Sequence, residues 1–208
     1  MPIPNAPAWE PWLGLLQKVS LFRGISPDDL CRLLLQLSPT VQRYPAGDII
    51  LLSGQENASI RIVLEGSITA SKISPGGQTV TMAHMQPGGI FGDVLSGSST
   101  PSPVTVTAAA PCTVLALPYE RLMLPGCSDA AHCVLLRNLV EAISDKYFSL
   151  CRRVDLLILK SLRAKLCAWL LEQYHRAGCA MFSTPLTRAQ LAEYLNCERS
   201  ALSRELSR

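Results

Sequence analysis

The sequence predicts an α+β protein in which an antiparallel, jelly-roll-like β-roll is followed by a long helix and a C-terminal helix-turn-helix. Three observations support this fold class. Residues 41–117 form short β-type runs separated by Gly and Pro, residues 127–177 contain neither Gly nor Pro, and a helix-capping sequence begins at Thr187. Turn signals every 8 to 12 residues or so are typical of sandwiches and barrels, whereas an uninterrupted apolar-periodic stretch is typical of a helix.

The composition is that of a globular protein without membrane helices. The 208 residues, 48% of them hydrophobic, can bury the core of one large domain or two smaller ones. No apolar run reaches the roughly 18 to 20 residues of a membrane span, and the first residues do not have the pattern of a signal peptide. We therefore expect a cytoplasmic protein that does not enter the membrane and whose eight cysteines are reduced thiols.

Charge is distributed unevenly along the chain, although the formal net charge is only +3. Residues 1–126 carry 7 Lys and Arg against 8 Asp and Glu, whereas residues 127–208 carry 12 against 8. This asymmetry favours a polyanion-binding module at the C-terminal end, although a solvated face gives the same count.

The β-type region turns sharply at several glycines and contains an unusual loop. Residues 91–106, "FGDVLSGSSTPSPVTV", combine a Gly-Asp pair with small hydroxyl residues and contain no Arg or Lys. The amide groups of such a loop could hold an anion. The glycines expected at sheet turns are Gly66, Gly76, Gly77, Gly88 and Gly92.

The long helix predicted over residues 127–160 carries two apolar rows. One row, at alternating spacings of three and four, is a heptad seam, and the other lies on the neighbouring face. A helix lying on its own β-domain needs only one apolar face, so the second face indicates a dimer. The seam consists of Cys133, Leu136, Val140, Ile143, Tyr147, Leu150, Val154 and Leu157, and the other row of Leu135, Leu139 and Ala142.

Residues 187–208 have the proportions of a helix-turn-helix, preceded by a shorter helix that Gly178 can cap. Thr187 and Gln190 form a capping box at its start, and Asn196 can adopt the positive φ of the turn. The residues expected to pack inward are Leu191, Ala192, Leu195, Leu202 and Leu206. The residues expected on the outward side of the second helix, where Arg and Ser can bond to bases or phosphates, are Arg199, Ser200, Ser203 and Arg204.

The order of these parts resembles the CRP/FNR family of bacterial transcription regulators over nearly the whole chain. The resemblance rests on "LFRGISPDDLCRLL", on the β-region from "YPAGDIILLSGQ" to "GGIFGD", and on "LTRAQLAEYLNCERSALSREL". It implies an effector-sensing roll over 1–126, a dimerisation helix over 127–160 and a DNA-binding domain over 161–208, whose wing would follow residue 208. It also implies a homodimer that binds palindromic double-stranded DNA, with RNA polymerase and a small-molecule effector as further partners.

The resemblance assigns individual DNA contacts as well. Arg199, Ser200 and Arg204 match base-reading positions, while Thr187 and Arg188 match phosphate-contacting ones. Glu198 departs from the pattern, because a short capping side chain is usual there.

The resemblance also locates an effector pocket. The cyclic-nucleotide-binding members have a Gly-Glu pair for the ribose and an Arg followed by Ser or Thr for the cyclic phosphate. Here Asp93 stands for the Glu, and Ser102 and Pro103 stand for the Arg and its partner. Without a guanidinium, we expect no tight binding of cyclic AMP. The expected pocket comprises Gly92, Asp93, Val94, Ser102, Pro103, Leu150 and Cys151, the last two from the long helix.

The sequence gives weaker support for a haem, thiol, metal or enzymatic site. A haem- or thiol-based redox or gas sensor of the same family is one alternative, with His84 or Pro2 as formal haem ligands. Cys127, His132 and Cys133 lie close together but lack zinc-site spacing. The first 30 residues contain no Cys, so the usual iron–sulfur cluster is excluded. A cupin-like metal enzyme is a remote alternative, because the chain has only three His; we expect no enzyme activity, cofactor or metal.

Overall fold

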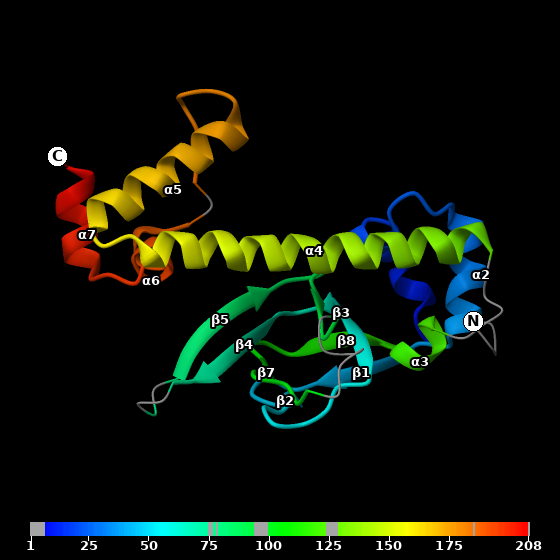
Figure 1. Ribbon diagram of the computed structural model, residues 1–208. Coiled ribbons are helices and arrows are strands. Elements are labelled where there is room, and N and C mark those ends of the chain that lie inside the picture. Colours follow the sequence, from blue (N-terminus) through cyan, green and yellow to red (C-terminus); the bar gives the residue numbers. More distant parts are fainter. Residues whose placement is uncertain are drawn as a thin grey trace. The chain divides into compact units, whose positions relative to one another are not determined.

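The computed structural model describes residues 7–74, 77, 79–93, 100–123, 129–184 and 186–207 (Figure 1). The chain divides into two compact units, Met1–Ile143 and Ser144–Arg208. The division falls within one long helix, α4 (Ala130–Ile158), so each unit contains part of α4. None of the helices in the described residues is long and apolar enough to cross a membrane.

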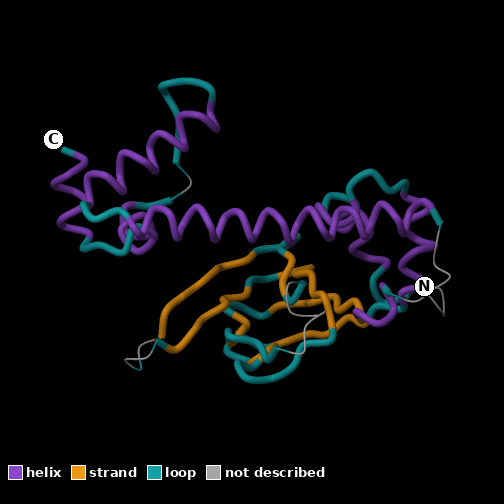
Figure 2. The backbone as a smooth tube through the Cα atoms, in the orientation of Figure 1, coloured by secondary structure: helices purple, strands orange, loops and turns teal. Residues whose placement is uncertain are grey.

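The first unit contains a roll of two four-stranded antiparallel sheets, as the sequence predicts (Figure 2). The strand orders are β1-β8-β3-β6 in one sheet and β2-β7-β4-β5 in the other. The strands are β1 (Thr40–Tyr44), β2 (Ile49–Leu51), β3 (Ser59–Glu65), β4 (Ile68–Ile73), β5 (Thr79–Met85), β6 (Ile90–Phe91), β7 (Thr105–Ala108) and β8 (Cys112–Pro118).

Short helices cover one face of the first sheet and form a second core there. They are η1 (Glu10–Trp12), α1 (Leu13–Leu16), η2 (Ser20–Phe22), α2 (Pro27–Leu37) and α3 (Tyr119–Leu122). Ile60 and Ile62 of β3 belong to this helical core, whereas Val63 belongs to the core between the sheets. Strand β3 is therefore buried on both faces.

The tight connection between β3 and β4 explains one of the predicted glycines. Gly66 has φ +74°, and a Cβ there would lie 2.1 Å from the carbonyl oxygen of Pro111. Since real Cβ atoms do not approach that closely, only glycine fits. The start of β8, at Cys112, therefore lies directly against the turn between β3 and β4.

Helix α4 carries both predicted apolar rows. Leu135 and Leu139 are buried in the helical core of the first unit, which confirms that this row packs on the protein's own β-domain. Most seam positions are exposed instead, with Val140 62% and Leu150 60% accessible. Ile143 differs from the expectation for the seam, because it also packs against the helical core.

The second unit is helical and has its own core. It contains the end of α4 together with α5 (Leu162–Ala177), α6 (Arg188–Tyr194) and α7 (Arg199–Leu206). Gly178 caps α5 at φ +67°, as predicted. The buried core residues are Leu156, Leu166, Trp169, Leu191, Ala192, Leu195 and Leu202.

Candidate DNA-reading surface and effector pocket

The helix-turn-helix begins and turns at the residues that the sequence indicates. Thr187 accepts a hydrogen bond from the Gln190 amide, and the Gln190 side chain accepts one from the Thr187 amide, which completes the capping box. Asn196 has φ +51° between α6 and α7. The Cys197 amide donates to the Ala192 carbonyl at 2.9 Å, so the turn is closed by backbone bonds.

The inward residues of the motif are those predicted, with one exception. Leu195 and Leu202 are fully buried, and Ala192 is buried where α6 and α7 pack together. Leu206 is 39% exposed, so the prediction that it anchors α7 was wrong. Leu206 is the last residue of α7, and it does not belong to the core of the second unit that includes Leu202.

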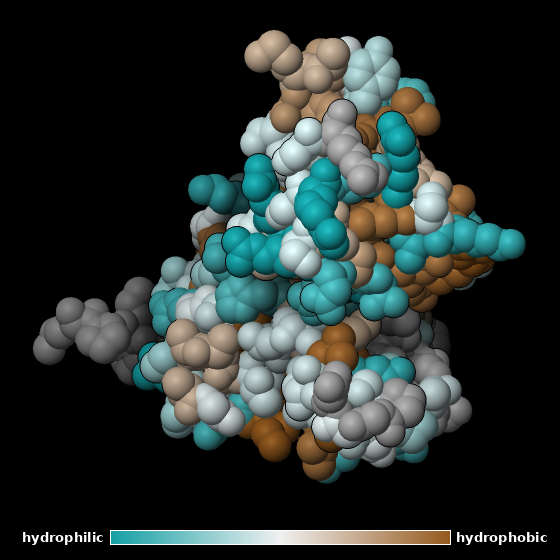
Figure 3. Space-filling view, turned by 90° about the vertical axis from the view of Figure 1, so that its left-hand side faces the viewer, coloured by the Kyte–Doolittle hydropathy of each residue, from teal (hydrophilic) through white to brown (hydrophobic). Residues whose placement is uncertain are grey.

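The predicted DNA contacts lie at the surface of this unit. Arg188 and Thr187 are exposed at the start of α6, and Arg199, Ser200 and Arg204 are exposed on α7, while Ser203 is half-buried. None of these three arginines forms an ion pair with another described residue. Figure 3 faces the side on which α5–α7 lie, and hydrophilic side chains project there between hydrophobic patches.

Other charged groups of the unit are engaged in its own packing. Glu172 pairs with Arg152 at 3.1 Å and with Arg176 at 2.6 Å, and the guanidinium of Arg153 lies 5.3 Å from the ring centre of Tyr194. These arginines are thus distinguished from the unpaired ones on α6 and α7. Glu198 is the N-cap of α7, but its side chain makes no capping hydrogen bond.

In the roll, two of the residues expected to bind an effector, Asp93 and Ser102, are buried, and Ser102 is already hydrogen-bonded within the protein. Ser102 is 2% exposed, its hydroxyl donates to the Val104 carbonyl at 2.8 Å, and its amide donates to the Gln55 carbonyl at 2.8 Å. Asp93 is 4% exposed and follows Gly92, which has φ +76°. Val94 lies outside the described residues, and Leu150 and Cys151 lie on the part of α4 in the second unit.

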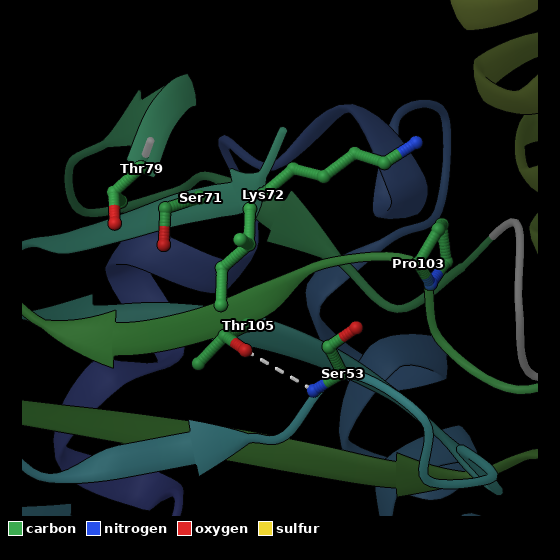
Figure 4. Close-up of a pocket in the computed structure, with 7 residues that line it drawn as sticks. Ser53, Ser71, Lys72, Thr79, Pro103 and Thr105 are labelled. Carbon is green, nitrogen blue, oxygen red and sulfur yellow. Dashed lines mark hydrogen bonds between the residues drawn. The ribbon is translucent and has the colours of Figure 1, made fainter. Parts of the chain in front are cut away.

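Pro103 lines a groove on the face of the second sheet that points away from the interior of the roll (Figure 4). The groove has a volume of about 400 Å³ and is lined by Ser53, Ser71, Lys72, Ile73, Thr79, Pro103 and Thr105. Ser71 and Thr105 alternate with buried Ala70 and Val106, so the groove is on the outer face of the roll. The structure thus separates Pro103 from buried Ser102 and Asp93.

The structure adds a residue that the sequence interpretation missed. Arg61 of β3 alternates with Ile60 and Ile62, and it is paired in register with Phe91, which is buried between the sheets. Its side chain therefore faces the interior of the roll. Burial lowers the pKa of Arg61, and burial likewise raises the pKa of neighbouring Tyr44. The signal was a single charged residue in the otherwise apolar run "IRIVL".

The candidate metal and haem ligands do not converge in the described residues. His132 is buried with Nε2 2.9 Å from the Leu122 carbonyl, whereas the adjacent Cys133 is exposed. His84 is exposed on β5, as expected for a solvated strand face. No cluster of three potential metal ligands occurs where the structure is described, and Cys127 and Pro2 lie outside that part.

Comparison with known proteins agrees with this architecture. A cyclic nucleotide-binding domain model matches residues 41–123, and a Crp-like helix-turn-helix domain model matches residues 164–208. Together they define a transcription regulator with a nucleotide-sensor-like roll. The chain belongs to the CRP/FNR family, whose members are regulators rather than enzymes.

Solved structures share the fold at low sequence identity. The catabolite activator protein of Thermus thermophilus is 22% identical, with a TM-score of 0.59 over 90% of this chain and 85% of that one. FixK2 of Bradyrhizobium japonicum is 22% identical, with a TM-score of 0.52 over 81% and 83%. The sensor domain of DNR from Pseudomonas aeruginosa is 20% identical, with a TM-score of 0.54 over 76% and 99%.

Curated relatives match about half of this chain. The potassium channel KOR2 of Oryza sativa subsp. japonica is 30% identical over 111 residues, which are 53% of this chain and 15% of the channel. The potassium channel SKOR of Arabidopsis thaliana is 27% identical over 54% of this chain and 13% of the channel. The similarity therefore concerns a small part of each channel.

Proposed function

We propose that the protein is a cytoplasmic, homodimeric, sequence-specific DNA-binding regulator of transcription. The observation that carries this proposal is the α6–α7 pair, in which a complete capping box and a buried core hold unpaired, exposed Arg199 and Arg204 on one helix. An arginine fork at the start or middle of a recognition helix suits guanine O6 and N7 in the major groove. RNA polymerase is the partner that such a regulator would influence.

The exposed seam of α4 supports dimerisation. Val140, Tyr147, Leu150 and Val154 form an apolar row at heptad spacing and are exposed where the structure is described. Two such helices pack in parallel about a two-fold axis. A two-fold dimer reads a palindrome whose half-sites are about one helical turn, roughly 34–36 Å, apart.

The sensor domain is proposed to respond to an effector other than a cyclic nucleotide. Ser102 and Pro103 supply no cation where the family's phosphate-binding arginine would stand, and the Ser102 hydroxyl is already bonded to Val104. Within the roll, Gly92, Asp93 and Ser102 remain our proposed effector-binding residues.

The DNA-reading assignment is tested with the full chain and a duplex selected from a random palindromic library. Arg204→Ala is expected to weaken binding to the selected site by about 1–3 kcal/mol and to relax base preference. Arg188→Ala should weaken binding to all sequences alike and flatten the salt dependence. Fluorescence anisotropy across salt concentrations measures both; equal losses by both variants on every sequence would contradict the assignment.

A further inference from the structure

The inside of the roll contains a guanidinium with no described counter-ion. Arg61 forms no ion pair with any carboxylate of the described residues, although it faces the apolar interior between the sheets. An enclosed charge is unfavourable unless hydrogen bonds or an opposite charge compensate it. The partners of Arg61 are neutral oxygens, namely Asn57 Oδ1 and the Ser59 carbonyl, the latter at 3.4 Å.

Only one corner of the guanidinium makes these bonds. Both go from Nη1, while Nε is buried and has no hydrogen-bond partner among the described residues. Nη2 donates no hydrogen bond to the described residues either. The Nε and Nη2 groups lie on the same edge of the planar guanidinium, and their parallel N–H bonds match the two oxygens of a carboxylate or phosphate.

The anchor of Arg61 also connects it to the effector loop. Asn57 is 4% exposed, and its Nδ2 donates to the Ser59 carbonyl at 2.8 Å and to the Gly92 carbonyl at 2.9 Å. A Cβ on Gly92 would lie 2.8 Å from that same Nδ2, so the backbone there is held tightly against Asn57. An anion on Arg61 would therefore act on a group bonded to the first residue of the loop.

We propose that Arg61 is the anion-recognition residue of the effector pocket and that its Nε–Nη2 edge takes an oxyanion-bearing small molecule, a carboxylate or a phosphate. This rests on the proposed function, in which the roll is the sensor. Asn57 is a positioning residue that fixes Nη1 and relays occupancy to Gly92. The cation thus comes from a central strand of the first sheet instead of from the end of the loop at Ser102 and Pro103.

Thermal unfolding of the full chain tests the site with two probes, sodium benzoate and sodium phosphate, against sodium chloride at equal ionic strength. At least one oxyanion is expected to raise Tm by about 2–4 °C more than chloride does. Arg61→Met should abolish this shift. Arg43→Met is the matched control, because Arg43 is an exposed arginine of the same sheet, and it should keep the shift.

The stability of Arg61→Met without a probe distinguishes an anion-binding role of Arg61 from a structural role. If Arg61 awaits a ligand, Arg61→Met without a probe should be at least as stable as the wild type, because it removes an uncompensated charge. A marked loss of Tm together with an unchanged oxyanion shift would overturn the proposal. If Arg61→Met does not fold, Arg61→Lys decides, since it keeps the charge and loses the Nε–Nη2 edge: at least tenfold weaker binding supports the proposal, and unchanged affinity overturns it.

Nitrogen-15 NMR of arginine side chains provides a direct readout. The Arg61 Nε–H resonance, assigned by its absence in Arg61→Lys, should shift on addition of the effective probe and not of chloride. Absence of any response to either oxyanion up to roughly 20 mM would overturn the proposal, since it excludes even millimolar affinity. Micromolar binding of cyclic AMP would instead contradict the proposed function, and its loss in Arg61→Met would still assign the cation to Arg61.

Discussion

The two units of the protein use arginine in opposite ways. In the roll, Arg61 faces the interior and is bonded to Asn57, while its Nε–Nη2 edge has no hydrogen-bond partner among the described residues. In the helical unit, Arg199 and Arg204 are exposed on α7 and unpaired among the described residues. A small anion is bound most selectively when it leaves water, whereas DNA phosphates and base edges must be reached from outside. We therefore propose that the difference in burial separates an anion-sensing role of Arg61 from a DNA-contacting role of Arg199 and Arg204.

Disrupting the α4 seam is expected to give the largest effect, because it separates the two subunits that are proposed to bind one palindrome together. Val140→Asp with Leu150→Asp places charges at two exposed seam positions that do not belong to either core of the roll. Sedimentation should show a monomer at micromolar concentration. Affinity for a palindrome should fall by roughly 10²–10⁴-fold, since the two half-sites are no longer bound together.

Phe148→Asp is the matched control for the seam. Phe148 is also an exposed apolar residue of α4, at 56%, but it lies outside the heptad row. It should leave both the dimer and the DNA affinity unchanged. If the double seam variant still sediments as a dimer, α4 is not the dimer interface.

A pair of glycines compares the backbone constraints of the two units. Gly66 in the roll and Gly178 after α5 both have positive φ, but a Cβ meets Pro111 at 2.1 Å in the first case and nothing within 4 Å in the second. Gly66→Ala is expected to lower the free energy of unfolding by about 3 kcal/mol or more. Gly178→Ala should lower it by about 1 kcal/mol, since only the positive φ is unfavourable. Urea unfolding measures both, and equal losses would show that the turn at Gly66 can yield.

The same contrast explains what the sequence could predict. The capping box at Thr187, the turn at Asn196 and the cap at Gly178 depend on neighbours in the chain, and all three were predicted correctly. The roll's interior site joins residues from separate segments, Asn57, Arg61 and Gly92. In a strand with one solvated face, alternation would place Arg61 in water. Its side chain is half-buried because both faces of β3 are covered, which the local pattern does not encode.

Leu206 illustrates the same limit at the scale of one helix. The spacing of four from Leu202 correctly places the two leucines on one side of α7. Burial, however, depends on whether another element reaches that turn, and the core of the second unit includes Leu202 and does not include Leu206. Periodicity predicts a face, whereas the extent of cover along that face is a tertiary property.

A smaller effect is expected at the start of the reading helix. Glu198 is the N-cap of α7 without a capping side-chain bond, and Ser can accept the amide hydrogen bond that Glu does not accept here. Glu198→Ser should raise the stability of the second unit by about 0.5–1 kcal/mol. It should also raise DNA affinity about two- to threefold on all sequences, because one negative charge near the phosphates is removed.

Glu120→Ser is the control for this charge effect, since Glu120 is an exposed acidic residue of α3 in the roll. It changes the net charge equally and should leave DNA affinity unchanged. Tighter binding by both variants would mean that net charge, and not the position of Glu198 on the reading surface, controls affinity.

Cyclic nucleotides are expected to produce no effect on either unit. The strongest feature of a cyclic-phosphate site is a guanidinium fork at the end of the loop, and we propose that Ser102 and Pro103 stand in its place. Arg61 is placed differently. It lies on β3, opposite Phe91 in register and hydrogen-bonded to Asn57, near the start of the loop. Titration calorimetry with cyclic AMP and cyclic GMP should show no dissociation constant below about 10 μM, or roughly −7 kcal/mol. Tighter binding that survives Arg61→Met would mean that loop amides alone hold the phosphate, and the roll would then sense nucleotides without Arg61.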